Sequence, residues 1–109
     1  MDSITIEEVG KNERRCRTTF PISNYPLTLD FSPEQPPQGR DVEQVGEKAV
    51  SLVKEILGIK GIDGVRISRN MLTIIKKGKI KWEEIESDII KAFKNAYGFS
   101  GRIVPERGF

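Results

Sequence analysis

Residues 65–75, with the sequence VRISRNMLTII, carry the clearest structural pattern in this chain. Two short runs rich in apolar and β-branched residues, 65–68 and 71–75, are separated by Arg69 and Asn70. Runs of this composition favour extended backbone, and a short polar pair between them is typical of a tight turn. We therefore predict a β-hairpin here, ended by the charged, glycine-containing segment 76–79.

A helix is predicted on the N-terminal side of this hairpin. Apolar residues recur there at helical spacing and form one stripe: Val42, Val45, Ala49, Leu52, Val53 and Ile56. Asp41 is the candidate N-cap, with Gln44 three residues further on, and Gly58 is the candidate stop. We expect one helix over residues 41–57 and a glycine-rich turn over residues 61–64 before the hairpin begins.

A second helix is predicted on the C-terminal side, over residues 81–97. Its buried stripe consists of Trp82, Ile85, Ile89, Phe93 and Ala96. Glutamates near its start suit the positive end of the helix dipole, and Gly98 ends it. Residues 102–104 could then add a short final strand.

The first third of the chain is predicted to be extended. Residues 4–6 alternate, residues 10–14 form a polar loop, and a second strand begins at Arg15. In that strand Cys16 and Thr18 share one face, while Arg15 and Arg17 share the other. A third run over residues 27–31 follows Pro26, which limits it to an edge strand or an extended loop, and residues 32–39 form a proline-rich loop.

The element order is therefore strand, strand, helix, strand, strand, helix, with the optional last strand. Hairpins make neighbouring strands antiparallel, so we predict an α+β two-layer sandwich with both helices on one face of an antiparallel sheet. The other face is expected to meet solvent and to carry Arg15, Arg17 and Arg66. A chain of 109 residues is the usual size of one domain, and we expect residues 1–109 to form one.

The composition excludes several kinds of chemistry. The chain contains no histidine and one cysteine, Cys16. Ser-His and Cys-His catalytic pairs, an internal disulfide and a tetrahedral zinc site within one chain are thus ruled out. We expect no enzyme activity, no cofactor and no metal site, and a cytoplasmic protein without membrane contact, because no segment approaches the length of a bilayer span. Cys16 is either a buried core residue or a chemically active thiol, as a reactive group or as one ligand of a cluster shared between chains.

Basic residues gather in two segments, although the net charge is only +2. One segment lies in the first third, where the two predicted strands and the polar loop at 10–14 suggest a first hairpin, and the other follows the second hairpin at 65–75. The candidate partner-binding residues are Lys11, Asn12, Arg14, Arg15, Arg17, Arg66, Arg69, Lys76 and Lys77. Three interpretations remain open for them: an ordinary solvated surface, a docking surface for an acidic protein, and a nucleic-acid interface.

The segment 50–97 resembles the NifU-like (Nfu) N-terminal domain family. That family combines an apolar helix, a short phrase of the type Gly-Val-x-x-Val, a hydrophobic strand, and Trp-Glu-x-Ile or Trp-Glu-x-Leu at the start of the last helix. Here these parts are residues 52–59, then IDGVRI at 62–67, MLTII at 71–75 and KWEEI at 81–85. In residues 9–20 the chain departs from the family, because the prolines usual between its first two strands are missing.

The resemblance implies the same order of strands and helices. It also implies an accessory role in iron–sulphur protein maturation, exerted through contacts with a protein partner. The Cys-x-x-Cys motif that holds the cluster in Nfu proteins belongs to their other domain, so cluster binding is not carried over to this chain. The resulting hypothesis is a non-enzymatic protein-binding module, and the alternative is a small nucleic-acid-binding domain that uses basic residues on the open sheet face.

Overall fold

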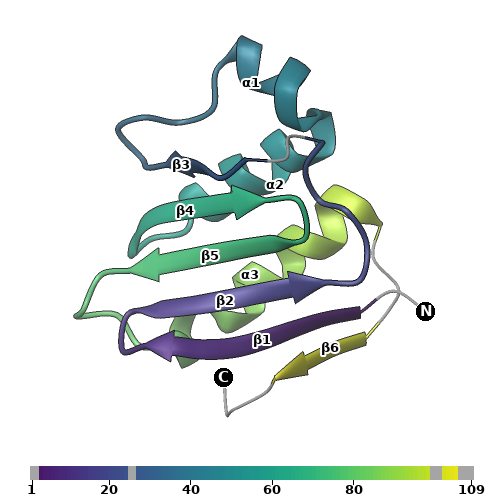
Figure 1. The fold of residues 1–109 in the computed structure, drawn as a ribbon. Helices are drawn as coiled ribbons and strands as arrows, with labels where there is room; N and C mark the ends of the chain where they lie inside the picture. The colour runs from purple at the N-terminus through teal and green to yellow at the C-terminus, as the bar shows by residue number, and fades with distance from the viewer. Residues whose placement is uncertain (1–2, 25–26, 99–101, 106–109) are drawn as a thin grey trace.

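Six strands form one sheet, and two long helices pack against one of its faces (Figure 1). The structure, a computed structural model, describes residues 3–24, 27–98 and, for their backbone, 102–105. Its elements are β1 (Ser3–Gly10), β2 (Glu13–Thr18), β3 (Leu29–Phe31), α1 (Gly39–Val45), α2 (Glu47–Leu57), β4 (Ile62–Ser68), β5 (Met71–Lys76), α3 (Trp82–Tyr97) and β6 (Arg102–Pro105). The predicted α+β sandwich is confirmed.

The strand order in the sheet is β3-β4-β5-β2-β1-β6. Strands β1 to β5 pair antiparallel with one another, as predicted, and β3 lies at one edge. At the other edge β6 runs parallel to β1, with Ser3 opposite Arg102. The prediction of a wholly antiparallel sheet was therefore wrong at this edge, because a strand that follows α3 reaches β1 by a crossover rather than by a hairpin turn.

One of the two hairpin turns is as predicted, and the other is tighter than the sequence suggested. The turn between β4 and β5 is Arg69-Asn70, as predicted. The turn between β1 and β2 consists of Lys11 and Asn12 alone, so the predicted loop over 10–14 was too long. The predicted turn over 61–64 was also misplaced, because β4 already begins at Ile62 and passes through an irregularity of register before Gly64.

The predicted single helix over 41–57 is in fact two helices, separated at Gly46. Gly46 has φ 102°, a conformation that glycine adopts without the strain that a Cβ would add. The Val45 carbonyl just before it accepts a hydrogen bond from the backbone N–H of Asn24 at 3.0 Å. Asp41 is not the N-cap: the helix begins after Gln38, whose backbone N–H donates to the Asp41 carboxylate at 2.6 Å. The break leaves Val42 36% exposed, although it was predicted to belong to the buried stripe.

The core lies between the sheet and helices α2 and α3. The largest fully buried side chains include Phe93, Ile4, Leu52, Ile67 and Ile74, which come from both layers. Helix α3 matches its prediction closely, and its C-cap Gly98 is left-handed at φ 57°. Cys16 is fully buried, and burial raises the pKa of its thiol to about 12. A buried, protonated thiol behaves as a small apolar side chain, which is the first of the two roles considered for it.

Candidate partner-binding surfaces

The nine candidate residues separate into three places in the structure. Arg15, Arg17 and Arg66 lie on the open face of the sheet. Arg69 lies in the β4–β5 turn at one end of the sheet. The other five lie at the opposite end, where the β1–β2 turn meets the end of β5: Lys11, Asn12, Arg14, Lys76 and Lys77.

On the open face, each arginine has a carboxylate partner. Arg15 lies opposite Thr73, which in turn lies opposite Arg66, so the three side chains share one row. Arg15 Nη1 and Arg17 Nε contact Glu7 Oε1 at 3.2 and 2.9 Å.

Arg66 Nε contacts Asp30 Oδ1 at 2.7 Å, and this hydrogen bond raises the pKa of the guanidinium. The arginines of the open face are therefore paired with carboxylates and do not form a basic patch.

At the opposite end of the sheet, two cations are buried. Arg14 is 6% exposed and Lys76 is 5% exposed, because both point to the side of the sheet that the helices cover. Together with Lys11, Lys81 and Trp82 they form what we call the cationic corner. It lies where the β1–β2 turn and the loop after β5 approach the start of α3, at the left-hand end of the sheet in Figure 1.

The indole of Trp82 organises this corner. The Arg14 Cζ atom lies 4.6 Å from the ring centroid, and Lys76 Nζ lies 5.6 Å from it, both within the range of a cation–π interaction. The indole Nε1–H donates to the Lys11 carbonyl at 3.2 Å, which ties the first hairpin to α3. The corner therefore connects segments that are about 70 residues apart in sequence, as the spacing of Lys11 and Trp82 shows.

The two buried cations donate hydrogen bonds only to neutral groups, and not all of their hydrogen-bond donors have a partner. Lys76 Nζ donates to Asn12 Oδ1 at 3.1 Å and to the Lys77 carbonyl at 3.4 Å. Arg14 Nη1 donates to the carbonyls of Gly10 and Glu13 at 3.3 and 3.4 Å, and its buried Nε has no hydrogen-bond partner. Within the described residues, neither cation forms a salt bridge with a carboxylate.

A groove of about 370 Å³ opens beside these side chains. It is lined by Lys11, Arg14, Lys76, Gly78, Ile80, Lys81, Trp82 and Glu83. Four of these residues are cationic and one is anionic, so the lining carries a formal charge of +3. The positive end of α3, which begins at Trp82, adds to the same field.

The sequence-based candidate list lacks two residues of the cationic corner, Lys81 and Trp82, and the less expected of the two is Trp82. Its position in the apolar stripe of α3 predicts a core residue, and it is indeed only 6% exposed. The alternation of β2 would have placed Arg14 beside Cys16 on the inner face. The pairing of β2 with β5, which brings Arg14 opposite Ile74, is a long-range feature without a local sequence signal.

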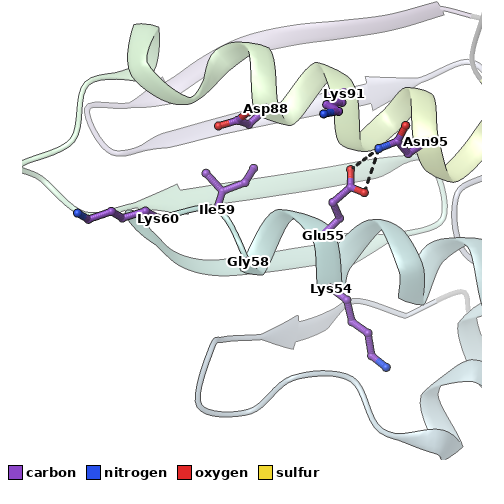
Figure 2. A pocket seen from close by; sticks show the side chains of 8 residues that line it. All are labelled: Lys54, Glu55, Gly58, Ile59, Lys60, Asp88, Lys91 and Asn95. Carbon is purple, nitrogen blue, oxygen red and sulfur yellow. Dashed lines mark hydrogen bonds between the residues drawn. The ribbon is translucent and has the colours of Figure 1, made fainter.

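A second groove, of about 440 Å³, lies between α2 and α3 on the outer side of the helices (Figure 2). Asn95 Nδ2 bridges it by donating to both carboxylate oxygens of Glu55, at 3.2 and 3.3 Å. Its lining mixes Lys54, Lys60 and Lys91 with Glu55 and Asp88. These charges largely balance one another, so this groove lacks the charge excess of the cationic corner.

Over residues 3–24 and 27–98, no group of three or more His, Cys, Asp or Glu side chains is arranged to hold a metal ion. No helix in the described part of the chain is both long and apolar enough to cross a membrane.

The family described as "Scaffold protein Nfu/NifU N terminal" matches residues 23–99 of the chain. The match includes Lys76 and Trp82 but begins after β2, so it leaves Arg14 outside. The family's description names a scaffold role rather than a reaction. No curated protein matches the sequence.

Solved structures share the fold. The crystal structure of a Staphylococcus aureus protein has a TM-score of 0.63 at 13% identity, covering 84% of this chain and 98% of that one. A NifU-like protein from Saccharomyces cerevisiae, solved by NMR, has a TM-score of 0.56 at 13% identity, covering 92% of this chain and 81% of that one. The NMR structure of a Staphylococcus epidermidis protein has a TM-score of 0.54 at 14% identity, covering 84% of this chain and 93% of that one. These similarities establish a common fold.

Proposed function

Because this chain belongs to the Nfu/NifU N-terminal scaffold domain family, we propose that it is a non-enzymatic module that binds a protein partner in iron–sulphur protein maturation. The family match over residues 23–99 is the observation that carries the proposal. The fold similarity to the yeast NifU-like protein is consistent with it.

The position of Cys16 supports a role through contacts rather than through cluster ligation. A cluster ligand must reach the metal as a thiolate, which needs a lowered pKa and access to the surface. Cys16 has neither, because its side chain is fully buried in the core and its pKa is raised to about 12. In this proposal the cluster is held by another protein or domain, and this chain contributes a binding surface.

Nucleic-acid binding through the open face has less support. The open-face arginines are already paired with Glu7 and Asp30, so little positive charge is left to attract phosphates. Strands β1 to β5 also place no aromatic side chain on that face, whereas sequence-tolerant binding of single strands relies on aromatic stacking.

The test is a nuclease-treated pull-down from the source cell with the tagged protein, compared with a tag-only control. We expect enrichment of iron–sulphur assembly proteins or of their client proteins. Binding should then be reproduced with the purified partner by calorimetry, with a Kd no weaker than roughly tens of micromolar, about 6–7 kcal/mol. If the purified assembly proteins do not bind, the proposal fails. A parallel pull-down without nuclease tests the alternative: proteins enriched there but lost after nuclease treatment would instead favour nucleic-acid binding.

A further inference from the structure

We propose that the cationic corner binds a carboxylate side chain presented by an acidic segment of the partner protein. This inference rests on the proposed function, since it assigns the chemistry by which that partner is recognised. The starting observation is the burial of two cations, Arg14 and Lys76, without a carboxylate partner in the described part of the chain.

Such an arrangement is unusual because charged side chains are rarely buried unless they are paired. Charge-assisted hydrogen bonds are normally about 2.7–2.9 Å long. The bonds from Arg14 Nη1 to carbonyls are 3.3 and 3.4 Å, and Arg14 Nε has no partner. The guanidinium is therefore fixed in place by Trp82 while part of its hydrogen-bonding capacity is unused.

The site is also accessible. Both buried cations line the groove of about 370 Å³, which opens between the β1–β2 turn and the start of α3. Lys11 and Lys81 are exposed at its rim, so an approaching anion meets positive charge before it reaches the buried groups. Ile80 supplies an apolar wall against which the methylene groups of a glutamate side chain can pack.

The geometry favours a carboxylate over a nucleic acid. The Trp82 ring already contacts Arg14 and Lys76, and its N–H is bound to the Lys11 carbonyl, so the indole is not available to stack on a base. The cations converge on one groove instead of following a backbone track. A planar guanidinium can hold one carboxylate through two parallel hydrogen bonds, and the ammonium that lines the same groove adds a second positive charge.

A short oligoglutamate peptide is a suitable probe, with an oligoglutamine peptide of equal length as the uncharged control. Trp82 is the only tryptophan of the chain, so its fluorescence reports on this site directly. We expect a saturable change of Trp82 fluorescence, and a shift of its indole N–H signal by NMR, with oligoglutamate only. Screening by salt should weaken the binding.

Substitutions then identify the groups involved. Arg14→Gln and Lys76→Met each remove one buried charge, and we expect the Kd for oligoglutamate to rise at least about tenfold. Lys81→Gln, at an exposed rim position, should raise it about threefold without affecting folding. Arg17→Gln removes the same charge from the open face and should leave the Kd within about twofold of the unmodified protein. Circular dichroism serves as the control and should show that each variant is folded.

Several outcomes would overturn the inference. One is the absence of a fluorescence response at millimolar oligoglutamate. Another is an unchanged Kd in Arg14→Gln, Lys76→Met and Lys81→Gln. A third is displacement of the peptide by oligothymidylate or inorganic phosphate at equal concentration, since the site would then not select carboxylates.

The two proposals can fail separately. If Lys76→Met and Lys81→Gln still bind the purified assembly protein normally, the carboxylate site is wrong and the proposed function stands. If oligoglutamate binds as expected but no iron–sulphur assembly protein does, the site stands and the proposed function fails.

Discussion

Strand β2 places Arg15 and Arg17 on the open face of the sheet and Arg14 on the face that the helices cover. The side chains of Arg15 and Arg17 are 33% and 55% exposed, and both contact Glu7. Arg14 is 6% exposed, packs on Trp82 and has no carboxylate partner in the described residues. The exposed charges are thus neutralised by their neighbours, whereas the buried charge is not.

The two faces differ in what they contribute to stability. Exposed ion pairs such as Arg17–Glu7 are worth about 0–1 kcal/mol. A buried, unpaired cation is unfavourable by more than that unless cation–π contacts and hydrogen bonds offset it. A protein that keeps such a group commonly does so at a functional site, where stability is given up for binding. The functional surface is therefore expected on the inner face, and the contrast between the two faces can be tested by substitutions on each of them.

The largest effect is expected from Trp82→Ala. The substitution removes a buried aromatic ring, the hydrogen bond to Lys11 and the surface that supports both buried cations. We expect the free energy of unfolding to fall by about 3–5 kcal/mol, measured by urea denaturation. Arg66→Ala on the open face is the control and should change it by no more than about 0.5 kcal/mol. Similar small effects for both would show that the corner is not an integral part of the core.

The second prediction concerns alkaline pH and the inner-face residue Cys16. Its pKa is raised from 9.0 to about 12 by burial, so the folded state holds a proton that the unfolded state releases. Stability from this group is complete below pH 9 and is lost as the pH rises toward 12. At about 1.4 kcal/mol for each pKa unit, the loss amounts to a few kcal/mol.

Burial raises the pKa of Tyr97 as well and adds to the loss. The contribution of Cys16 is therefore taken as the difference between the unmodified protein and Cys16→Ala, by denaturation at several pH values. The variant should show a shallower decline above pH 9. Parallel curves would mean that the thiol does not titrate differently in the two states.

The third prediction tests whether burial of Lys76 is unfavourable. Lys76→Met keeps a flexible chain of similar length while removing the buried charge, and the hydrogen-bond acceptors that it leaves, on Asn12 and Lys77, belong to exposed residues. We expect the free energy of unfolding to rise by about 1 kcal/mol. Lys77→Met, at the exposed neighbouring position, is the matched control and should have little effect. A clear destabilisation by Lys76→Met alone would mean that the contacts with Trp82 and Asn12 outweigh the unfavourable burial.

The periodicity of apolar residues in the sequence is sufficient to predict most of the strands and helices. The hairpin at residues 65–75 and helix α3 were predicted closely, because each shows an uninterrupted pattern between clear turn or cap signals. The break at Gly46 was missed because the apolar stripe continues across it at helical spacing. What decides the break is a long-range contact, the hydrogen bond from Asn24 to the Val45 carbonyl, together with a positive φ that glycine permits.

The candidate site was predictable only in part. Alternation placed Arg15 and Arg17 on the open face, and the same rule extended by one step would have placed Arg14 inside. The general preference of arginine for the surface argues against that step. The pairing of Arg14 and Lys76 with Trp82 depends on β2 lying beside β5, and no local signal in the sequence specifies that pairing.

The smallest effect is expected from Glu7→Gln on the open face. Glu7 contacts both Arg15 and Arg17, so the substitution leaves two arginines without this carboxylate and should lower stability by no more than about 1 kcal/mol. The net charge rises from +2 to +3 because one negative charge is lost.

Retention of Glu7→Gln on a heparin column is the more informative measurement. Glu43→Gln, at an exposed position of α1, changes the net charge equally without affecting an arginine of the sheet. If pairing with Glu7 is what neutralises the open face, Glu7→Gln should elute at a higher salt concentration than Glu43→Gln, because two adjacent guanidinium groups then meet the polyanion together. Equal retention would show that the open-face arginines already act as unpaired charges, and the contrast between the two faces of β2 would then rest on burial alone.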